Sequence, residues 1–339
     1  MRYKVGLIGK GNVGSALIHL LHIKQCLLEK QLDIKFTLNA IFKSDGALLA
    51  QDNRGLHIPK IIKNEHDIKK MAQWSENVFA TDYINKSNFD IIIEATPTNP
   101  ENGEPGYSHI FKALSNNIDV VTSNKGPFFL YYKKITDLAR KKKCFLKYDA
   151  TVASCLPAIS IKKLLLGNEI ISIKAILNGT SNFILNKMTN EGLDFSSAFQ
   201  MAQRLGYTET NPYLDIDGLD SAGKIVILAN ELLGWSKSIH DVQIKGISEI
   251  SLQYIKSLSL NGQVIKPLSI AKRDKLIVEP KLIKKDSVLN LGDDLNGIIF
   301  KTHYAGPVVL IGKGAGGLEA ASALLNNLIE VILSRNKIT

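Results

Sequence analysis

The chain has few cysteines and no pattern that would pair them. Its 339 residues include three, Cys26, Cys144 and Cys155, which are far apart and form no C-x-x-C motif. This number and spacing argue against a disulfide framework and against a cysteine zinc site. Cys155, at a small-residue turn in TVASCLP, is a candidate reactive thiol, but an ordinary buried cysteine is the better interpretation.

The sequence also lacks an uninterrupted apolar run of about 18 residues, the length that a membrane-spanning helix needs. Its first residues, MRYKVGLIGKGNVG, lead directly into a strand and a glycine turn and leave no room for a signal peptide. The composition, with 45% hydrophobic and 22% charged residues, is typical of a soluble globular protein. We therefore expect a cytoplasmic protein of two domains without membrane contact.

Acidic residues are outnumbered, and the formal net charge is +10, from 42 Lys and Arg against 32 Asp and Glu. A nucleic-acid surface would gather this excess on one face, with aromatic residues among the cations. Here the lysines are spread along the chain and mixed with acids, and the short run Arg140–Lys143 has no aromatic neighbours of that kind. The surplus predicts a solvated basic surface and no nucleic-acid partner.

The first 150 residues alternate between apolar strands and helices. Because these strands are continuously apolar, they predict a parallel, doubly wound sheet that is covered on both faces. The expected strands are Tyr3–Ile8, Ile34–Phe42, Phe89–Ala95, Asp119–Ser123 and Cys144–Tyr148, and the expected helices run from the glycine turn to about Glu29 and over Asp67–Trp74, His109–Asn116 and Tyr131–Lys142.

The pattern changes after Pro157. The expected helices are Ala158–Leu165, Asn182–Glu191, Phe195–Leu205, Asp220–Leu233 and finally Leu318–Leu333, and the expected extended segments are Ile170–Leu177, Lys275–Pro280, Ser287–Leu291, Gly297–Thr302 and Val308–Gly312. This order predicts an α+β domain with an open sheet and a last helix that packs back on the first domain. The predicted fold class is α/β, an N-terminal Rossmann-type parallel sheet with a second α+β domain.

A glycine motif, Gly9-Lys10-Gly11-Asn12-Val13-Gly14, separates the first strand from the first helix. G-x-G-x-x-G is common by chance, but its position between a strand and a helix is the context that dinucleotide binding needs. Glycines let the backbone approach a pyrophosphate, and the helix N-terminus supplies N–H donors. We therefore predict cofactor binding at Gly9, Gly11, Asn12, Val13 and Gly14; the alternative is a tight turn without a ligand.

The ends of the next strands indicate how a dinucleotide would lie. Lys43, at the end of the second strand, suits the 2′-phosphate of NADP, whereas the neighbouring Asp45 keeps NAD open. Thr96 ends a central strand on the expected nicotinamide side, and Ser123 and Lys125 end the following strand, at the edge where such sheets collect ligands. A solvated loop lysine is an equally good interpretation of Lys125 from its position alone.

An unusual concentration of acids precedes a buried helix. NGTSNFIL, GYTETNPYLD and DGLDSAGK contain Glu209, Asp215, Asp217, Asp220 and Lys224 among small residues, directly before the apolar run IVILA. Asp220 and Lys224 are four residues apart and therefore share one helix face. A surface pair of this kind contributes only about 0.3–0.5 kcal/mol. Because the helix is otherwise apolar, we favour a buried ion pair at the edge of a polar pocket.

The order of GKGNVG, EATP, VVTSNKGP, YDATV, ILNGTSNFIL, GYTETNPYLDIDGLDSAGK and GKGAGG resembles homoserine dehydrogenase, in the short form without a C-terminal regulatory domain. The resemblance implies NAD(P)-dependent interconversion of L-aspartate 4-semialdehyde and L-homoserine, on the route to threonine, methionine and isoleucine, by a homodimer. It implies that residues 1–150, completed by the C-terminal helix 318–335, form the dinucleotide-binding domain. Residues 151–317 would then form the substrate-binding and dimerisation domain.

The resemblance also implies roles for matching residues. Lys224 matches the proton donor, and Lys125 matches a second lysine where nicotinamide and substrate meet. The implied substrate-binding residues are Glu209, Asp215, Asp220, Gly179 and Thr180, and Gly206 and Gly316 join the implied cofactor-binding residues.

A cation loop is implied as well, with sodium held by the backbone carbonyls of Asp149, Val152, Ser154 and Leu156. The chain departs from the family pattern here, because Asp149 stands where Glu is usual and Ala153-Ser154-Cys155 where glycines are usual. It departs again at Ala320-Ala321, where Thr-Ala is usual, which removes a hydroxyl near the nicotinamide.

Three alternatives remain from the residues. The first is a related Rossmann oxidoreductase that acts on another small amino-acid semialdehyde. The second, aspartate semialdehyde dehydrogenase, is disfavoured because it needs a nucleophilic cysteine with a partner histidine, and no such motif surrounds Cys155. The third is a non-catalytic dinucleotide-binding protein, against which the presence of Lys125, Lys224 and the pocket acids argues.

Overall fold

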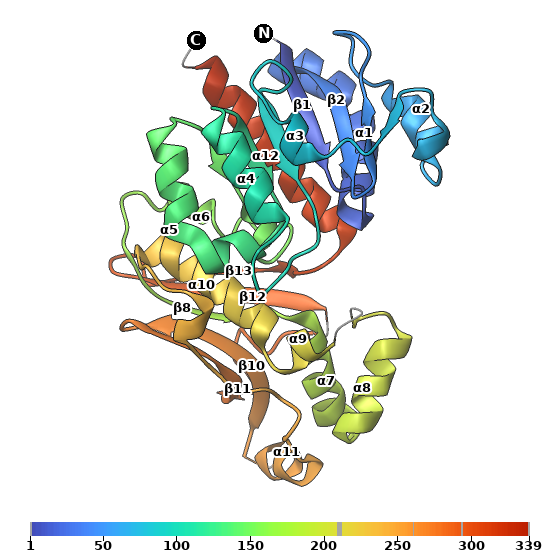
Figure 1. Cartoon of the computed structure of the whole chain (residues 1–339). Coiled ribbons are helices and arrows are strands. Elements are labelled where there is room, and N and C mark those ends of the chain that lie inside the picture. Colours follow the sequence, from blue (N-terminus) through green and yellow to red (C-terminus); the bar gives the residue numbers. More distant parts are fainter. Residues whose placement is uncertain (1, 209–211, 260, 293, 338–339) are drawn as a thin grey trace. The chain divides into compact units, whose positions relative to one another are not determined.

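The computed structural model describes residues 2–208, 212–259, 261–292 and 294–337. The chain forms two compact units, whose elements are labelled in Figure 1. The first unit consists of Met1–Thr151 together with Gly316–Thr339, and the second of Val152–Ala315. The chain therefore leaves the first unit once and returns to it with its last helix.

A seven-stranded sheet forms the centre of the first unit. Its strands, in sheet order, are β4 (Trp74–Glu76), β3 (Gly46–Leu49), β2 (Lys35–Lys43), β1 (Arg2–Ile8), β5 (Ile91–Glu94), β6 (Asp119–Thr122) and β7 (Leu146–Lys147). β1 is parallel to β2 and β5, and β6 and β7 continue the parallel set, while β3 and β4 are antiparallel. The direction of winding reverses at β1, and the carboxyl ends of strands at such a point are where open α/β sheets bind ligands.

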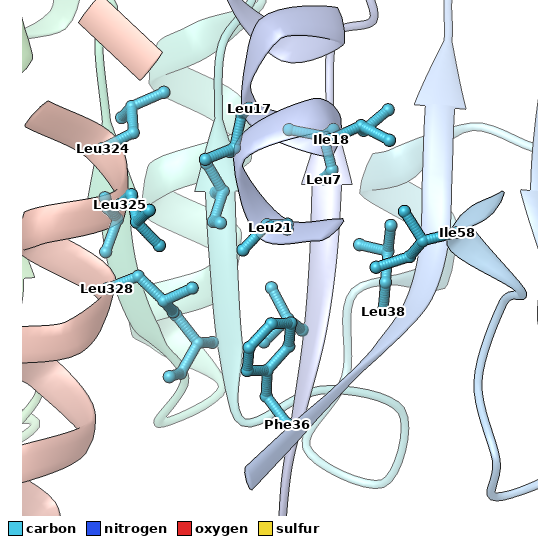
Figure 2. Close-up of a cluster of buried hydrophobic side chains, with 14 of the residues drawn as sticks. Leu7, Leu17, Ile18, Leu21, Phe36, Leu38, Ile58, Leu324, Leu325 and Leu328 are labelled. Atoms are coloured by element: carbon cyan, nitrogen blue, oxygen red, sulfur yellow. The ribbon is translucent and has the colours of Figure 1, made fainter. Parts of the chain in front are cut away.

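Helices surround this sheet, and the last helix of the chain belongs to its core. They are α1 (Asn12–Leu32), α2 (Ile58–Lys63), α3 (Ala80–Tyr83), α4 (Gly106–Ser115), α5 (Gly126–Lys141) and α12 (Gly317–Asn336), with short 3₁₀ turns η1 (Ile68–Lys70) and η2 (Asp149–Thr151). Figure 2 shows Leu17 and Leu21 of α1 beside Leu324 and Leu328 of α12, all fully buried. Burial of one such side chain contributes about 1.5–3 kcal/mol, so α12 is an integral part of this unit.

By length and hydropathy alone, α12 is also apolar enough to cross a membrane. Half of the apolar window is buried inside the protein. Core helices of globular proteins meet the same criterion, and the packing of α12 against α1 accounts for its composition.

The second unit contains a six-stranded sheet covered by helices. Its strands, in sheet order, are β13 (Pro307–Lys313), β12 (Leu295–Thr302), β8 (Ile170–Ile176), β10 (Gln263–Lys272), β11 (Lys275–Lys284) and β9 (Val242–Ile244). The strands pair antiparallel except for β11 and β9. The helices are α6 (Ile161–Leu164), α7 (Gly179–Asn190), α8 (Phe195–Arg204), α9 (Tyr213–Ile216), α10 (Leu219–Leu233) and α11 (Leu252–Ser259), with η3 at Ile239–Asp241. Every residue of α10 from Ser221 to Asn230 is buried.

Two elements predicted from the sequence are wrong. The helix expected over Asp67–Trp74 is the short turn η1 followed by β4, because Trp74 pairs with Leu48 of β3. The strand expected over Ser287–Leu291 is a turn whose Leu289 and Leu291 fill a core cluster without pairing to a neighbouring strand. In addition, α5 begins at Gly126 rather than Tyr131, and its backbone kinks at that tyrosine.

Candidate active site

The glycine turn has the geometry of a phosphate site. Gly9 has φ +96°, and an ideal Cβ there would lie 2.6 Å from the carbonyl oxygen of Ala95. A Cβ on Gly14 would clash with the carbonyl oxygen of Gly9, so the turn and the first helical turn are in backbone contact. A Cβ on Gly11, the N-cap of α1, would meet nothing within 4 Å, and glycine has no side chain that could cap the helix. The first N–H groups of α1, at Asn12 and Val13, are thus available to an anion.

Two cations belong to the region where the adenosine ribose of a dinucleotide binds in this fold, Lys43 at the end of β2 and Lys10 in the glycine turn after β1. Lys43 is exposed there. Lys10, which the sequence analysis did not single out, is half-buried, and its Nζ donates to the backbone oxygen of Glu65 at 2.8 Å. Burial lowers the pKa of the Lys10 ammonium, and the Lys43 cation lowers it further against the opposing effect of Glu65. Asp45, the feature that favoured NAD, forms an ion pair with Lys69.

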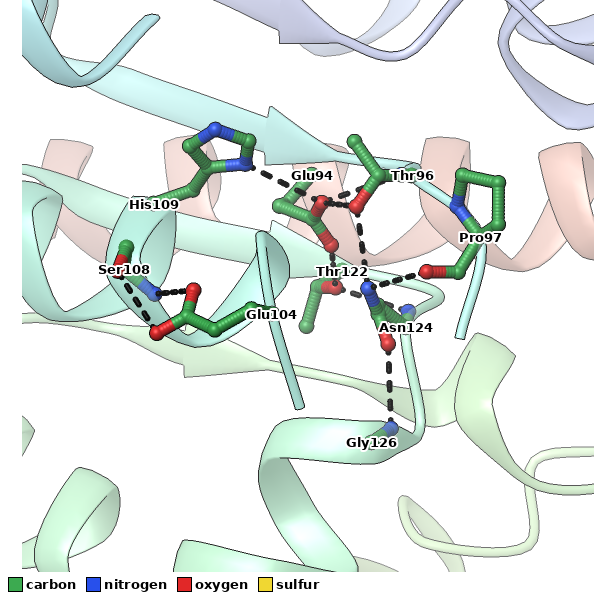
Figure 3. Close-up of polar contacts among 9 residues, drawn as sticks. All are labelled: Glu94, Thr96, Pro97, Glu104, Ser108, His109, Thr122, Asn124 and Gly126. Carbon is green, nitrogen blue, oxygen red and sulfur yellow. Dashed lines mark hydrogen bonds and ion pairs between the residues drawn. The ribbon is translucent and has the colours of Figure 1, made fainter. Parts of the chain in front are cut away.

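The loops that follow β5 and β6 are tied together by side-chain hydrogen bonds, as Figure 3 shows. Asn124 Nδ2 donates to Thr96 Oγ1 at 3.1 Å and to the Pro97 oxygen at 3.2 Å. Lys125 is half-buried at the N-cap of α5, and its backbone N–H donates to Thr98 Oγ1 at 3.3 Å. Ser123 is also half-buried, and its backbone N–H donates to the backbone carbonyl oxygen of Glu94. The structure thus brings Thr96, Ser123 and Lys125 to one edge of the first sheet.

In the second unit, Lys224 and Asp220 form a buried ion pair. Nζ lies 2.6 Å from Asp220 Oδ2, and the two side chains are 10% and 13% exposed. The same Nζ donates to the carbonyl oxygen of Leu177, at the end of β8, at 2.7 Å. The lysine is therefore fixed between its own helix and the neighbouring strand, as the i,i+4 spacing and the apolar helix indicated.

Asp215 joins this pair through a residue that the sequence analysis left without a role. Asn178, the N-cap of α7, donates through Nδ2 to Asp215 Oδ1 at 2.6 Å and to Asp220 Oδ2 at 3.1 Å. Thr180 Oγ1 lies 3.2 Å from Asp215 Oδ2 and 2.6 Å from the backbone oxygen of Tyr207. Asn178, Thr180 and Asp215 are each at most 8% exposed. One amide therefore holds two carboxylates beside Lys224.

The other predicted substrate and cofactor residues have less distinct surroundings. A Cβ on Gly179 would meet nothing within 4 Å, and Gly206 is exposed with φ +75°. Glu209 lies outside the described residues. Asp217, another acid of the same sequence block, is exposed.

The C-terminal loop approaches the glycine turn. Gly316 has φ +129°, a conformation that side chains disfavour, and a Cβ on Gly317 would lie 3.3 Å from the backbone oxygen of Asn12. Ala320 and Ala321 follow inside α12 and are 7% and 0% exposed. The position where the family usually has a threonine hydroxyl is therefore packed inside the protein on α12.

The predicted cation ligands are buried but belong to two units. In the first, Asp149 accepts a hydrogen bond from Asn327 Nδ2 at 2.8 Å and donates its backbone N–H to Asn327 Oδ1. In the second, Val152 is fully buried, Ser154 has φ 47°, and the Leu156 oxygen accepts the Ala158 N–H at 2.7 Å. Within the described residues, no group of three or more His, Cys, Asp or Glu side chains could hold a metal ion.

Comparison with known proteins identifies the family. The family model described as homoserine dehydrogenase matches residues 157–329, and the model described as homoserine dehydrogenase, NAD binding domain, matches residues 9–149. The chain belongs to the homoserine dehydrogenase family. It is therefore an NAD(P)-dependent oxidoreductase of amino-acid biosynthesis, and the predicted resemblance, fold class and enzyme class are confirmed.

Relatives match almost the whole chain. A homoserine dehydrogenase of Methanocaldococcus jannaschii is 41% identical over 98% of this chain and 99% of its own length. An NAD(+)-dependent homoserine dehydrogenase of Pseudomonas canavaninivorans is 36% identical over 97% and 96%. The crystal structure of a putative homoserine dehydrogenase from Archaeoglobus fulgidus superposes with a TM-score of 0.89 at 31% identity, over 97% of this chain and 99% of the other.

Proposed function

We propose that this chain interconverts L-aspartate 4-semialdehyde and L-homoserine with Lys224 as the proton donor and NADP as the preferred cofactor. The observation that carries the proposal is the cluster of the buried Asp215 and Lys224 with the half-buried Asp220. Two carboxylates and one ammonium give this cluster a formal charge of −1, which suits a substrate that carries its own ammonium group.

Lys224 is placed to deliver a proton. Reduction of an aldehyde adds a hydride to the carbonyl carbon and a proton to the oxygen, and the bound nicotinamide supplies the hydride. The Lys224 ammonium has three N–H donors, of which one faces Asp220 and one faces the Leu177 oxygen. Among the described residues these two acceptors leave the third N–H for the substrate oxygen. In the reverse reaction the same nitrogen accepts the proton of the homoserine hydroxyl.

Asp215 is the proposed ligand of the substrate ammonium. Its Oδ1 accepts from Asn178 at 2.6 Å, and Oδ2 lies 3.2 Å from the Thr180 hydroxyl, which also faces the Tyr207 oxygen. The Asn178 hydrogen bond orients the carboxylate before the substrate binds. Glu209, Asp220, Gly179 and Thr180 complete the proposed substrate-binding set.

Lys125 is the proposed electrostatic partner on the cofactor side. It lies in the loop that Asn124 connects to Thr96. We place the nicotinamide beside Thr96 and Ser123, and the pyrophosphate on the glycine turn. The structure supports this placement because these residues lie at the carboxyl ends of adjoining parallel strands.

Lys43 and Lys10 support NADP over NAD. Burial is the main cause of the lowered pKa of Lys10, and the Lys43 cation lowers it further, so a 2′-phosphate beside the two cations would stabilise both charges. Asp45, which could accept a ribose hydroxyl instead, is already paired with Lys69. The name of the Pseudomonas relative states NAD(+) dependence, so the preference needs a direct measurement.

We also propose a homodimer that forms through the sheet of the second unit. Val309, Ile299, Lys174, Ile270 and Ile277 are successive cross-strand neighbours and therefore make one row on one face of five strands. Val309 is 37% exposed, and the other four are half-buried. A second copy of the chain would cover this mostly apolar row. The molecular mass of the Ile299→Asp variant in solution tests this interface. We expect a monomer, and an unchanged oligomer would argue against the interface.

A monovalent cation at the Asp149–Leu156 loop is the remaining proposal. Positive φ at Ala153 and Ser154 turns this segment sharply, which supports convergence of its carbonyl groups. Turnover should be higher in sodium than in a bulky organic cation at equal ionic strength.

We also propose a cytoplasmic location, with which the free cysteines of the described chain are compatible.

The central experiment is a spectrophotometric assay of homoserine oxidation with NADP and NAD in parallel. The proposal expects turnover with both and a higher kcat/KM with NADP. Lys43→Ala should lower kcat/KM for NADP by about tenfold or more and leave NAD nearly unchanged, because it removes a charged contact to the extra phosphate. Equal effects on the two cofactors would contradict the phosphate assignment, and no turnover with either would contradict the function.

A further inference from the structure

A fully buried acid ends β5 and has no role in the proposed mechanism. Glu94 is 0% exposed, although the isolated carboxylate of a glutamate is costly to remove from water. The charge is held by hydrogen bonds at the ligand-binding edge of the sheet, which Figure 3 shows. Oε1 accepts from the Thr96 backbone N–H at 3.1 Å and from the Thr96 hydroxyl, and Oε2 accepts from the Thr122 hydroxyl at 3.1 Å.

The carboxylate fixes the direction of every hydrogen bond around it. An ionised carboxylate only accepts, so the hydroxyls of Thr96 and Thr122 must both donate to Glu94. Each hydroxyl is then an acceptor for Asn124, which donates Nδ2 to Thr96 Oγ1 at 3.1 Å and its backbone N–H to Thr122 Oγ1 at 3.0 Å. Because Asn124 Nδ2 faces Thr96 Oγ1 and the Pro97 oxygen, its Oδ1 faces the Gly126 N–H, at 3.1 Å.

This network leaves the two loops little freedom to move apart. A Cβ on Gly126 would lie 2.7 Å from the Asn99 backbone oxygen, and one on Gly106 would clash with the Asn124 carboxamide. Lys125 lies between Asn124 and Gly126, both of which the network holds. Thr96 and Lys125 are thus positioned by one charge, that of Glu94.

We propose that Glu94 is a positioning residue for hydride transfer, which acts through Thr96 and Asn124 on the nicotinamide side of the site. The inference rests on the proposed placement of the nicotinamide beside Thr96. His109 of α4 lies beside the buried carboxylate, with Nδ1 3.6 Å from Oε1, beyond hydrogen-bond distance, and the imidazole 9% exposed. Within the described part of the chain, the hydrogen bonds of the Glu94 side chain go to Thr96 and Thr122 and not to the phosphate turn, so its charge should affect turnover more than cofactor affinity.

The decisive variant is Glu94→Gln, which keeps the shape and removes the charge. A glutamine presents one acceptor and one NH₂ donor, so in either orientation an N–H faces a group that already donates to Glu94. With the NH₂ at Oε1 it faces the Thr96 N–H, and with the NH₂ at Oε2 it faces the Thr122 hydroxyl. In the first orientation two donors oppose each other, and in the second the Thr122 hydroxyl must turn from donor to acceptor, so either orientation loses a hydrogen bond that the carboxylate accepts.

The matched control is Asp119→Asn, at the opposite end of the same strand pair. Asp119 is 3% exposed, pairs with Ile91 in register where Thr122 pairs with Glu94, and accepts hydrogen bonds from Arg335 and Phe145. It is another buried carboxylate, but it lies three residues, or about 10 Å, away from the ligand edge. Its neutralisation should lower the melting temperature without changing turnover.

The measurements are kcat for semialdehyde reduction well below the melting temperature, the NADPH dissociation constant from nicotinamide fluorescence, and the melting temperature. For Glu94→Gln we expect kcat to fall on the order of 10–100-fold, as for other misplaced reacting groups, with the dissociation constant within about threefold of the parent. For Asp119→Asn we expect stability alone to change. A Glu94→Gln protein with parental kcat would overturn the inference, as would an equal loss of kcat in Asp119→Asn.

A second variant covers failure of the first to fold. Thr122→Val removes one hydroxyl link between Glu94 and Asn124 at nearly constant volume, and it should lower kcat in the same direction with NADPH affinity retained. Parental kcat in Thr122→Val, when Glu94→Gln does not fold, would assign Glu94 a structural role only. An unmodified protein without turnover would instead contradict the proposed function, so the two failures are distinguishable.

Discussion

Replacement of Lys224 by methionine separates the chemistry of the site from its stability. Methionine is unbranched and keeps most of the lysine volume, so the change removes the ammonium with little repacking. If Lys224 donates the proton, loss of this general acid should lower kcat by about 10²–10⁴. NADPH affinity should be unchanged, because none of the cofactor-binding residues proposed above hydrogen-bonds to Lys224.

The same substitution has a structural cost. Breaking a buried ion pair by removal of one partner costs about 3–5 kcal/mol. The Asp220 and Lys224 side chains are 13% and 10% exposed to solvent, and Asn178 still donates to Asp220 in the variant. We therefore expect the free energy of unfolding to fall by about 2–3 kcal/mol, at or below the low end of this range. A loss of activity could therefore come from partial unfolding alone.

The double variant Lys224→Met with Asp220→Asn resolves this ambiguity. It removes the uncompensated carboxylate and should recover most of the lost stability, since neutral replacement of both partners is often well tolerated. It should not recover turnover. The assay is initial-rate absorbance of NADPH at saturating semialdehyde, with thermal melts of each protein. Near-parental kcat in the single variant, or recovered kcat in the double variant, would refute the role of Lys224.

Three further predictions concern the cofactor turn, pH and the last helix. Gly14→Ala should abolish NADPH binding and lower stability, because its Cβ would clash with a backbone carbonyl of the turn, whereas Gly11→Ala should fold normally and only weaken binding, as fluorescence titration and melts would show. The kcat/KM preference for NADP should fall as pH rises into the alkaline range, since the Lys10 pKa is lowered by burial and the ammonium deprotonates before an ordinary lysine; a preference that falls only together with the titration of ordinary lysines would contradict its phosphate role. Arg335→Leu should cost about 3 kcal/mol or somewhat less, measured by urea unfolding, because it leaves Asp119 buried without its bidentate partner while the arginine itself is 29% exposed.

Local sequence spacing was sufficient for several features. Asp220 and Lys224 lie one helical turn apart, and their apolar neighbours indicated burial, so the ion pair follows from helix geometry. The glycine turn follows in the same way, since its strand and helix are adjacent in the sequence.

Features that depend on distant residues could not be predicted. The environment of Lys10 is set by Glu65, 55 residues away, and the Glu94 network needs Thr122, 28 residues away. The turn at Ser287–Leu291 was mistaken for a strand because burial of alternate leucines against a core gives the same pattern as strand pairing.

Both lysine-bearing regions depend on an asparagine that neither charge nor spacing singled out. Asn124 follows β6 and caps Gly126 of α5 through Oδ1, while its Nδ2 faces oxygen acceptors of the loop after β5. Asn178 follows β8 and caps Ser181 of α7 through Oδ1, while its Nδ2 faces Asp215 and Asp220. In each case a carboxamide satisfies a helix N–H with one end and presents donors to acceptors with the other. An aspartate has the same shape and would still cap the helix, but its second oxygen would face those acceptors without a hydrogen to share. The choice of asparagine over aspartate at these two strand ends therefore follows from the oxygens that each side chain faces.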